Sequence, residues 1–375
     1  MTASSNKRAP IPFVDLHSSY ADERDEIIAI VDEIFGSGQF LATKHVARFE
    51  AAAASAIGVS QVVAVDSGTD SLVLGMGGLG IGPGDEVITP PNSFLASTGA
   101  IIQIGATPVF ADVLPDQNID PDAVLQAITP RTKAIMIVHL SGRMADVARL
   151  SQIAEDHGLW LIEDAAQAMG SAHQGQMAGS FGHIGCFSAH PVKNLGAAGD
   201  GGFIATNDAA MAEQIRFTRR HGLADRDTAP SWGVVSRMDE LQAAVLCYRL
   251  TKLAAKIERR RDNAAIYRAS LDPSLVFHET CQDGDFNTFH TFVIQVDRRD
   301  QLRQHLGDQG ISTAIHYPVP IHLQPCARDL GWQAGDVPVV EAQAGRILSL
   351  PIHEFVTESD IKFVADTVNG FLSGS

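Results

Sequence analysis

Residues 134–164 read AIMIVHLSGRMADVARLSQIAEDHGLWLIED and fit a strand, a helix and a second strand in that order. The runs 134–139 and 160–164 are short and mainly apolar, whereas 146–157 carries its apolar residues at helical spacing. Apolar strands linked by a helix are typical of a parallel sheet that helices cover on both faces. This stretch therefore predicts an α/β fold with a large, mainly parallel sheet.

The same alternation of apolar runs and helical segments continues on both sides of this stretch, from about residue 60 to residue 207. Further strands are predicted over residues 62–65, 86–89, 107–113, 185–188 and 202–206. They place residues 1–250 in one large α/β domain, of which residues 1–10 are expected to be flexible.

A second, smaller domain is predicted after the first. Residues 238–271 contain no Gly or Pro and repeat apolar residues at helical spacing, so they predict one long helix, or two abutting helices, between the domains. A strand is expected over residues 289–296 and a helix over residues 300–306. Residues 251–375 therefore form a C-terminal α+β domain in this prediction.

The composition excludes several classes of protein. Of the 375 residues, 45% are hydrophobic and 19% are charged, as in ordinary globular proteins. Lys and Arg number 28 against 44 Asp and Glu, and this net charge of −16 argues against nucleic acid as a partner. The four cysteines include no CxxC pair. Because the first residues lack the apolar core of a signal peptide and no run of 18 apolar residues occurs, we expect no membrane partner and a cytoplasmic protein.

Three polar segments follow predicted strands, which is where open α/β sheets bind ligands. The segment DSGTDS, residues 66–71, suits either a phosphate or an ordinary helix cap. Asp164 ends an apolar strand, so its carboxylate needs a partner, either a protonated cofactor ring nitrogen or the helix start that follows. Lys193 lies in the glycine-rich segment FSAHPVKNLGAAGDGG, residues 187–202, and is either a surface lysine or a desolvated nucleophile toward a carbonyl.

Together these segments supply what pyridoxal phosphate (PLP, or PMP in its aminated form) needs: a phosphate cradle, an acid for the ring nitrogen and a Schiff-base lysine. Over residues 11–371 the chain also resembles the DegT/DnrJ/StrS-type sugar aminotransferases, which have the aspartate-aminotransferase fold, fold type I. The segments that carry the resemblance are DSGTDSL, PGDEVITPPNSFLAS, GATPVFADV, VHLSGRMAD, IEDAAQAMGS, FSAHPVKNLGAAGDGGFI and SRMDELQAA.

The resemblance implies roles for several residues. Lys193 matches the Schiff-base lysine of the family, and Asp164 matches the acid that keeps the pyridine nitrogen protonated. Gln167 is expected near the ring hydroxyl and Phe94 on the ring face. The residues expected to hold the phosphate are Gly68, Thr69 and Ser188.

The resemblance also implies a reaction, the transfer of an amino group from L-glutamate to a keto-sugar, nucleotide-linked, in amino-sugar biosynthesis. It implies a homodimer with active sites at the subunit interface. Three alternatives stay open: a keto-cyclitol or sugar phosphate as acceptor, a sugar dehydratase, whose relatives carry histidine in place of Lys193, and a non-catalytic PLP-binding regulatory protein. The candidate substrate residues are Arg143, His316, Tyr317 and His322, although His316 and Tyr317 also suit an extended turn before Pro318.

One position departs from the family pattern, and two motifs are set aside. Val235 stands where the family has an asparagine that reaches the cofactor phosphate of the neighbouring subunit, so this contact is expected to be missing or replaced. The GxGxxG match at Gly75, Gly77 and Gly80 falls at a helix end instead of a strand-to-helix turn, which argues against a dinucleotide. No metal is expected, because no common zinc spacing fits His183, Cys186 and His190.

Overall fold

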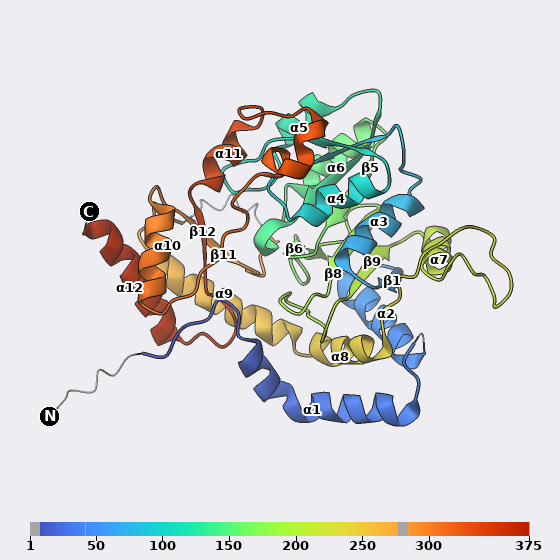
Figure 1. The fold of residues 1–375 in the computed structure, drawn as a ribbon, viewed down its shortest axis with the longest axis horizontal. Coiled ribbons are helices and arrows are strands. Elements are labelled where there is room, and N and C mark those ends of the chain that lie inside the picture. Colours follow the sequence, from blue (N-terminus) through green and yellow to red (C-terminus); the bar gives the residue numbers. More distant parts are fainter. Residues whose placement is uncertain (1–7, 42, 277–283, 375) are drawn as a thin grey trace.

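The computed structural model describes residues 8–41, 43–276 and 284–374 (Figure 1). Residues 1–7, part of the segment expected to be flexible, lie outside the described residues. Among the helices of the described part, none combines the length and the apolar character that crossing a membrane requires.

A seven-stranded sheet forms the centre of the molecule, in the order β1-β9-β8-β5-β4-β2-β3. The pairs from β8 to β3 are parallel, whereas β9 is antiparallel to both β1 and β8. The predicted mainly parallel sheet is thus confirmed. Its strands are β1 (Gln61–Val65), β2 (Glu86–Thr89), β3 (Thr107–Phe110), β4 (Thr132–Val138), β5 (Trp160–Asp164), β8 (Ile184–Ser188) and β9 (Gly202–Thr206).

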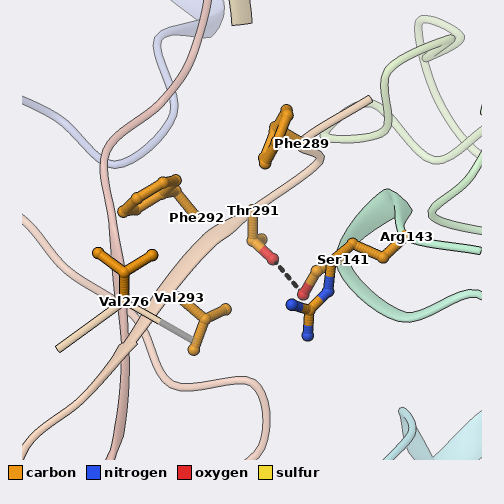
Figure 2. Close-up of a pocket in the computed structure, with 7 residues that line it drawn as sticks. All are labelled: Ser141, Arg143, Val276, Phe289, Thr291, Phe292 and Val293. Atoms are coloured by element: carbon orange, nitrogen blue, oxygen red, sulfur yellow. Dashed lines mark hydrogen bonds between the residues drawn. The ribbon is translucent and has the colours of Figure 1, made fainter. Parts of the chain in front are cut away.

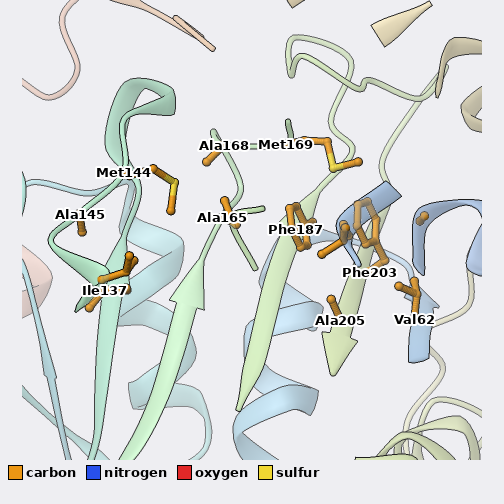
Figure 3. Close-up of a cluster of buried hydrophobic side chains, with 14 of the residues drawn as sticks. Val62, Ile137, Met144, Ala145, Ala165, Ala168, Met169, Phe187, Phe203 and Ala205 are labelled. Carbon is orange, nitrogen blue, oxygen red and sulfur yellow. The ribbon is translucent and has the colours of Figure 1, made fainter. Parts of the chain in front are cut away.

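Helices cover both faces of this sheet. They are α2 (Lys44–Ile57), α3 (Gly68–Gly78), α4 (Leu95–Gln103), α5 (Pro121–Ala127), α6 (Val147–Asp156), α7 (Ala209–Thr218) and α8 (Glu240–Leu250). Successive strand residues point to opposite faces, so Leu161 packs in a cluster with α2, α6 and α8, and Ile162 packs with α3, α4 and α7. Figure 3 shows the first cluster, in which the Phe187 and Phe203 rings stack with centroids 4.6 Å apart.

The helix predicted over residues 238–271 is two abutting helices. α8 ends at Leu250, and α9 (Leu253–Ser270) begins after a turn at Thr251 and Lys252. α9 then leads into a second hydrophobic core, where the Tyr267 and Phe292 rings stack with centroids 4.8 Å apart. The pair of helices therefore joins the two cores, as Figure 1 shows along the lower side of the molecule.

The second core surrounds an antiparallel pair, β11 (Phe292–Gln295) and β12 (Ile347–Leu350), with α10 (Arg299–Asp308) and α12 (Glu358–Ser373) packed beside it. The strand was expected from residue 289 but begins at Phe292, because Phe289 has a left-handed φ of 49° that a strand cannot contain. The helix expected over residues 300–306 is α10.

Other elements connect the two parts. α1 (Leu16–Ser37) contacts α8 through an ion pair of 2.7 Å between Glu23 and Arg249. A small sheet combines β6 (Ala172–His173), β7 (Gln176–Met177) and β10 (Asp285–Phe286). Within the predicted C-terminal domain, α11 (Pro338–Ala344) lies against the edge of the large sheet, since the Asp112 carboxylate after β3 accepts hydrogen bonds from its first N–H groups.

Glu240 ties the start of α8 to the start of α2, and its loss is expected to destabilise the fold. Its buried carboxylate accepts hydrogen bonds from the backbone N–H groups of Thr43, His45 and Val46 at 2.5, 2.9 and 3.3 Å. Burial raises the pKa of Glu240, but these hydrogen bonds outweigh it and hold the pKa below its usual value. We expect Glu240→Gln to lose about 2 kcal/mol of unfolding free energy in urea. The control Glu258→Gln, 63% exposed on α9, should lose less than about 0.5 kcal/mol; equal losses would contradict this role.

Candidate active site

Asp164 and Lys193 lie together at the carboxyl edge of the large sheet. Asp164 ends β5 and is only 6% exposed. Its carboxylate accepts hydrogen bonds from the Ser97 hydroxyl at 2.6 Å and the Ala166 N–H at 3.1 Å. Lys193 comes from the loop between β8 and β9, and β8 is the direct neighbour of β5. The neighbouring strand ends therefore bring together a lysine and a carboxylate that are 29 positions apart in the sequence.

The loop that carries Lys193 is firmly held. The Lys193 backbone N–H donates to the His190 carbonyl at 2.9 Å. The Arg249 guanidinium of α8 donates to the Gly196 and Ala197 carbonyls at 2.7 and 3.1 Å. A side chain at Gly196 would place its Cβ 2.5 Å from the Pro191 carbonyl oxygen, so only glycine fits there. Close approach of the backbone therefore explains the glycine at this position of the loop.

The Lys193 amine is suited to nucleophilic chemistry. Burial lowers its pKa, and the negative charge of Asp164 offsets part of that effect. A lysine with a lowered pKa is neutral in a larger fraction near neutral pH, and only the neutral amine attacks a carbonyl carbon or accepts a proton.

Gln167 and Tyr317 form a second pair beside these groups. Gln167 Nε2 donates to the Tyr317 hydroxyl at 3.1 Å, and its Oε1 accepts from the Ser141 N–H at 2.7 Å. Burial and the nearby Asp164 charge raise the pKa of Tyr317 to about 12, while the Gln167 hydrogen bond acts in the opposite direction. The phenol is therefore neutral at physiological pH.

Phe94 offers an open aromatic face at the same place. It directly precedes α4, is 58% exposed, and its ring centroid lies 5.8 Å from that of Tyr317. A half-exposed ring at the carboxyl edge of the sheet fits the predicted stacking on a planar cofactor.

The start of α3 has the form of a phosphate cradle. Ser67 caps the helix by accepting from the Asp70 N–H at 3.1 Å. A Cβ on Gly68 would lie 2.6 Å from the Ser188 Cβ, and one on Gly202 would lie 2.2 Å from the Ser67 carbonyl oxygen. These glycines bring the positive end of the helix dipole, with Gly68 and Thr69 as its first residues, against the end of β8. The residues present thus fit a phosphate group.

Acidic side chains surround this cradle. Burial, followed by the charges of Asp70, Asp239 and Asp200, raises the pKa of Asp66. The chain alone therefore gives the cradle N–H groups and a helix dipole within a negative local potential.

Two histidines lie near Lys193, one of which sequence reasoning missed. His316 Nδ1 lies 2.9 Å from the Ser349 hydroxyl, and burial together with the Lys193 charge lowers its pKa to about 4. The missed residue is His290, whose Nδ1 lies 3.3 Å from Asn194 Oδ1 and whose pKa burial and Lys193 hold well below the usual value. Asn194 follows Lys193 within a segment that carries the resemblance, but its contact with His290 gave no signal there. His290, two residues before β11, lies in none of these segments.

The other two candidate substrate residues are engaged elsewhere. His322 has no exposed side-chain surface, and its Nε2 lies 3.0 Å from Glu341 of α11. The Arg143 side chain is buried and donates to the Asp116 carbonyl. These placements favour a structural role for His322 and Arg143.

The motifs set aside earlier have structural explanations. Gly75 lies within α3, where a Cβ would come 2.6 Å from the Ile184 side chain, so it permits close packing of helix on strand. The Cys186 thiol donates to the Ser71 carbonyl, and His183 Nδ1 accepts from the Leu161 N–H at 3.0 Å. Across the described ranges, no three His, Cys, Asp or Glu side chains are grouped to hold a metal ion.

Val235 lies in an exposed loop. It is 54% exposed, and the next residue, Ser236, is buried and accepts a hydrogen bond from the Asp66 N–H at 3.2 Å. The exposed Val235 therefore directly precedes a residue that contacts the acidic cradle. Its side chain is apolar, at the position expected to differ from the family.

Acidification is expected to destabilise the cofactor-free chain through His316. Its pKa is 6.5 in the unfolded chain and about 4 in the folded one, so the unfolded chain binds the proton more readily between these values. Stability is then lost as the pH falls from 6.5 to 4, by up to about 3 kcal/mol for this group. Urea titrations across this range should show a shallower acid loss for His316→Gln. The exposed control, His157→Gln, should leave the loss of stability at low pH unchanged. The same unchanged loss in His316→Gln would contradict the burial of His316.

The fold and this site define a class of protein. A lysine and a carboxylate at the carboxyl edge of a seven-stranded sheet, with a second core at the C-terminal side, form the architecture of the fold-type I, PLP-dependent aminotransferases. The chain belongs to the DegT/DnrJ/EryC1/StrS aminotransferase family, whose profile matches residues 21–369. The family and the enzyme class expected from the sequence are thereby confirmed.

Two relatives illustrate the family. The chain is 43% identical to the erythromycin biosynthesis sensory transduction protein EryC1 of Saccharopolyspora erythraea, over 91% of this chain and 94% of the relative. It is 40% identical to the dTDP-3-amino-3,4,6-trideoxy-alpha-D-glucose transaminase of Streptomyces venezuelae, over 97% of each.

Solved structures agree with this assignment. S. venezuelae DesV in complex with a ketimine intermediate superposes with a TM-score of 0.94 at 39% identity, over 97% of this chain and 99% of that one. NtdA of Bacillus subtilis with bound cofactor PMP reaches 0.89 at 30% identity, over 98% and 86%. Family and neighbours together imply PLP or PMP as the cofactor type.

Proposed function

We propose that this chain is a PLP-dependent aminotransferase that moves an amino group from L-glutamate to the keto group of a nucleotide-linked sugar. The proposal rests on the position of Lys193 beside Asp164 at the carboxyl edge of the sheet. The Ser97 hydroxyl holds the Asp164 carboxylate by a hydrogen bond of 2.6 Å. The cradle at Gly68 and the open ring of Phe94 support it.

Each of these residues has a task in the proposed reaction. When bound, PLP supplies an electron sink for the carbon that carries the amino group. Lys193 Nζ would hold the cofactor covalently. When free, it would accept a proton from the donor α-carbon and pass that proton on to the cofactor. The Asp164 carboxylate keeps a proton on the ring nitrogen. Gln167 Nε2 donates toward the ring hydroxyl, and Gly68, Thr69 and Ser188 hold the phosphate.

The choice of acceptor is supported by the relatives. The S. venezuelae relative is named for a dTDP-linked amino sugar. The experiment that tests this choice incubates the purified protein with L-glutamate and dTDP- and UDP-linked keto-sugars, a keto-cyclitol and a keto-sugar phosphate. Mass spectrometry should detect an aminated nucleotide sugar together with 2-oxoglutarate. Product only from the cyclitol or the sugar phosphate would reassign the acceptor. Cofactor binding with no product from any acceptor would favour a regulatory role.

We further propose that the enzyme acts as a homodimer. Large apolar side chains are exposed on the α1 region, on α4 and on the loop before α8, among them Phe35, Phe40, Leu95, Trp232 and Val235. Trp232 is 99% exposed. A second copy of the chain would cover this large apolar side chain. A second copy could also bring positive charge to the acidic cradle.

Removal of Trp232 is expected to weaken this dimer. Sedimentation equilibrium of the wild type should show a dimer at micromolar concentration, and Trp232→Ala should raise the dissociation constant at least about tenfold. Leu125→Ala, at a side chain 40% exposed on α5, is the matched control and should leave it unchanged. A monomeric wild type would contradict the proposal.

A further inference from the structure

The amide of Gln167 is held from both sides. The Ser141 N–H donates to Oε1 at 2.7 Å, and Nε2 donates to the Tyr317 hydroxyl at 3.1 Å. A backbone N–H can only donate, so Oε1 must face Ser141 and the NH2 group must face the site. Ser141 therefore determines that Gln167 offers a donor, and not an acceptor, beside Tyr317.

Ser141 takes a backbone conformation that needs support. Its φ is 62°, and Gly142 follows with a φ of 81°. A left-handed φ costs a residue with a side chain about 1 kcal/mol or more, and such residues persist where their surroundings hold them. This conformation places the Ser141 N–H against Gln167, so the strained turn and the donor orientation of Gln167 depend on each other.

The support comes from the segment that enters the second core. Thr291, directly before β11, donates from its hydroxyl to the Ser141 hydroxyl at 2.7 Å. Figure 2 shows this bond crossing from the segment of Thr291 to the turn of Ser141. Both residues are only 4% exposed, so water does not readily replace the bond. A chain of three hydrogen bonds thus runs from Thr291 through Ser141 and Gln167 to Tyr317.

We propose that Thr291 is a positioning residue for the cofactor site. Through Ser141, Thr291 fixes the orientation in which Gln167 donates a hydrogen bond. The position of the segment that enters the second core thereby determines the position of the donor expected beside the ring hydroxyl of the cofactor. The inference rests on the proposed function, because it assigns Gln167 to that hydroxyl. Thr291 acts only through its neighbours and touches neither cofactor nor substrate in this account.

The test compares Thr291→Val with Thr288→Val. Thr288 lies in the same segment, is fully buried, and its hydroxyl is 3.0 Å from that of Ser171, which separately donates to the Gly142 carbonyl at 2.8 Å. Both variants remove one buried hydroxyl, so both should lower the melting temperature similarly. Only Thr291→Val should weaken PLP binding, by about fivefold to tenfold, and move the pH midpoint of the visible band of the lysine-bound cofactor.

A second variant keeps the result interpretable. Ser141→Ala removes the acceptor of the Thr291 bond but leaves its own N–H in place. It should reproduce the cofactor effects of Thr291→Val, and the double variant should be no worse than either single one. Equal cofactor readouts for Thr291→Val and Thr288→Val, or additive effects in the double variant, would overturn the inference while leaving the proposed function intact. A wild type that forms no lysine-bound band would overturn both.

Discussion

Lys193→Met is expected to lower turnover by about 10⁴-fold, because it removes both the covalent anchor and the proton acceptor of the proposed reaction. Methionine keeps the length of the buried stem, so the fold should remain. Burial lowers the pKa of Lys193, so keeping this amine protonated in the folded chain costs free energy. Loss of the amine should therefore not reduce the stability of the cofactor-free protein.

Steady-state kinetics with L-glutamate and an accepted keto-sugar measure this loss. The matched control is Lys133→Met, at an exposed lysine on β4, which should keep turnover within about twofold of the wild type. The melting temperature of the cofactor-free chain separates a catalytic loss from unfolding. Substantial residual turnover in Lys193→Met would show that Lys193 is not the catalytic lysine.

Asp164→Asn has the second-largest expected effect, a fall in kcat of about 10³-fold. The amide has nearly the same shape, and its oxygen can still accept the Ser97 hydrogen bond. It carries no negative charge, however, so it cannot keep a proton on a ring nitrogen. Since the Asp164 charge raises the pKa of Lys193, its loss should also move the Lys193 titration to lower pH.

A graded series checks the role of that charge. Ser97→Ala removes one hydrogen bond and leaves the charge in place, so it should lower kcat only about tenfold. The pH dependence of the reaction of Lys193 with an aldehyde, in cofactor-free protein, reports the Lys193 titration directly. If Asp164→Asn lowers kcat no more than Ser97→Ala and leaves that titration unchanged, the carboxylate serves as a helix cap and not as an acid partner.

The large sheet and the centre of the site were predictable because local sequence determines them. Strands such as β5 combine apolar composition with short length, and in parallel sheets the residues at their carboxyl ends converge. Asp164 and Lys193 could therefore be placed together without knowledge of any side-chain contact. The helical stretch over residues 238–271 was predicted as one helix or two, and the turn at Thr251 and Lys252 shows that it is two.

Other features depend on contacts between distant segments. Nothing in the local sequence distinguishes Ser97, whose hydroxyl donates to Asp164 only in the folded chain. Thr291 donates to Ser141, which lies 150 positions away in the sequence. His322 was considered as a substrate residue because of its motif, but the packing of α11 engages its ring with Glu341. Phenylalanine favours strands, yet the positive φ of Phe289 excludes it from a strand, and β11 begins only at Phe292. In each case tertiary packing decides what propensity cannot.

The visible absorption spectrum of the purified protein, recorded before and after addition of L-glutamate, tests whether Lys193 binds the cofactor and the donor then displaces it. With PLP present, we expect a band of the lysine-bound cofactor that disappears on addition of L-glutamate, with one 2-oxoglutarate released per site and no band in Lys193→Met. A band that L-glutamate leaves unchanged, or no band even with added PLP, would contradict this expectation.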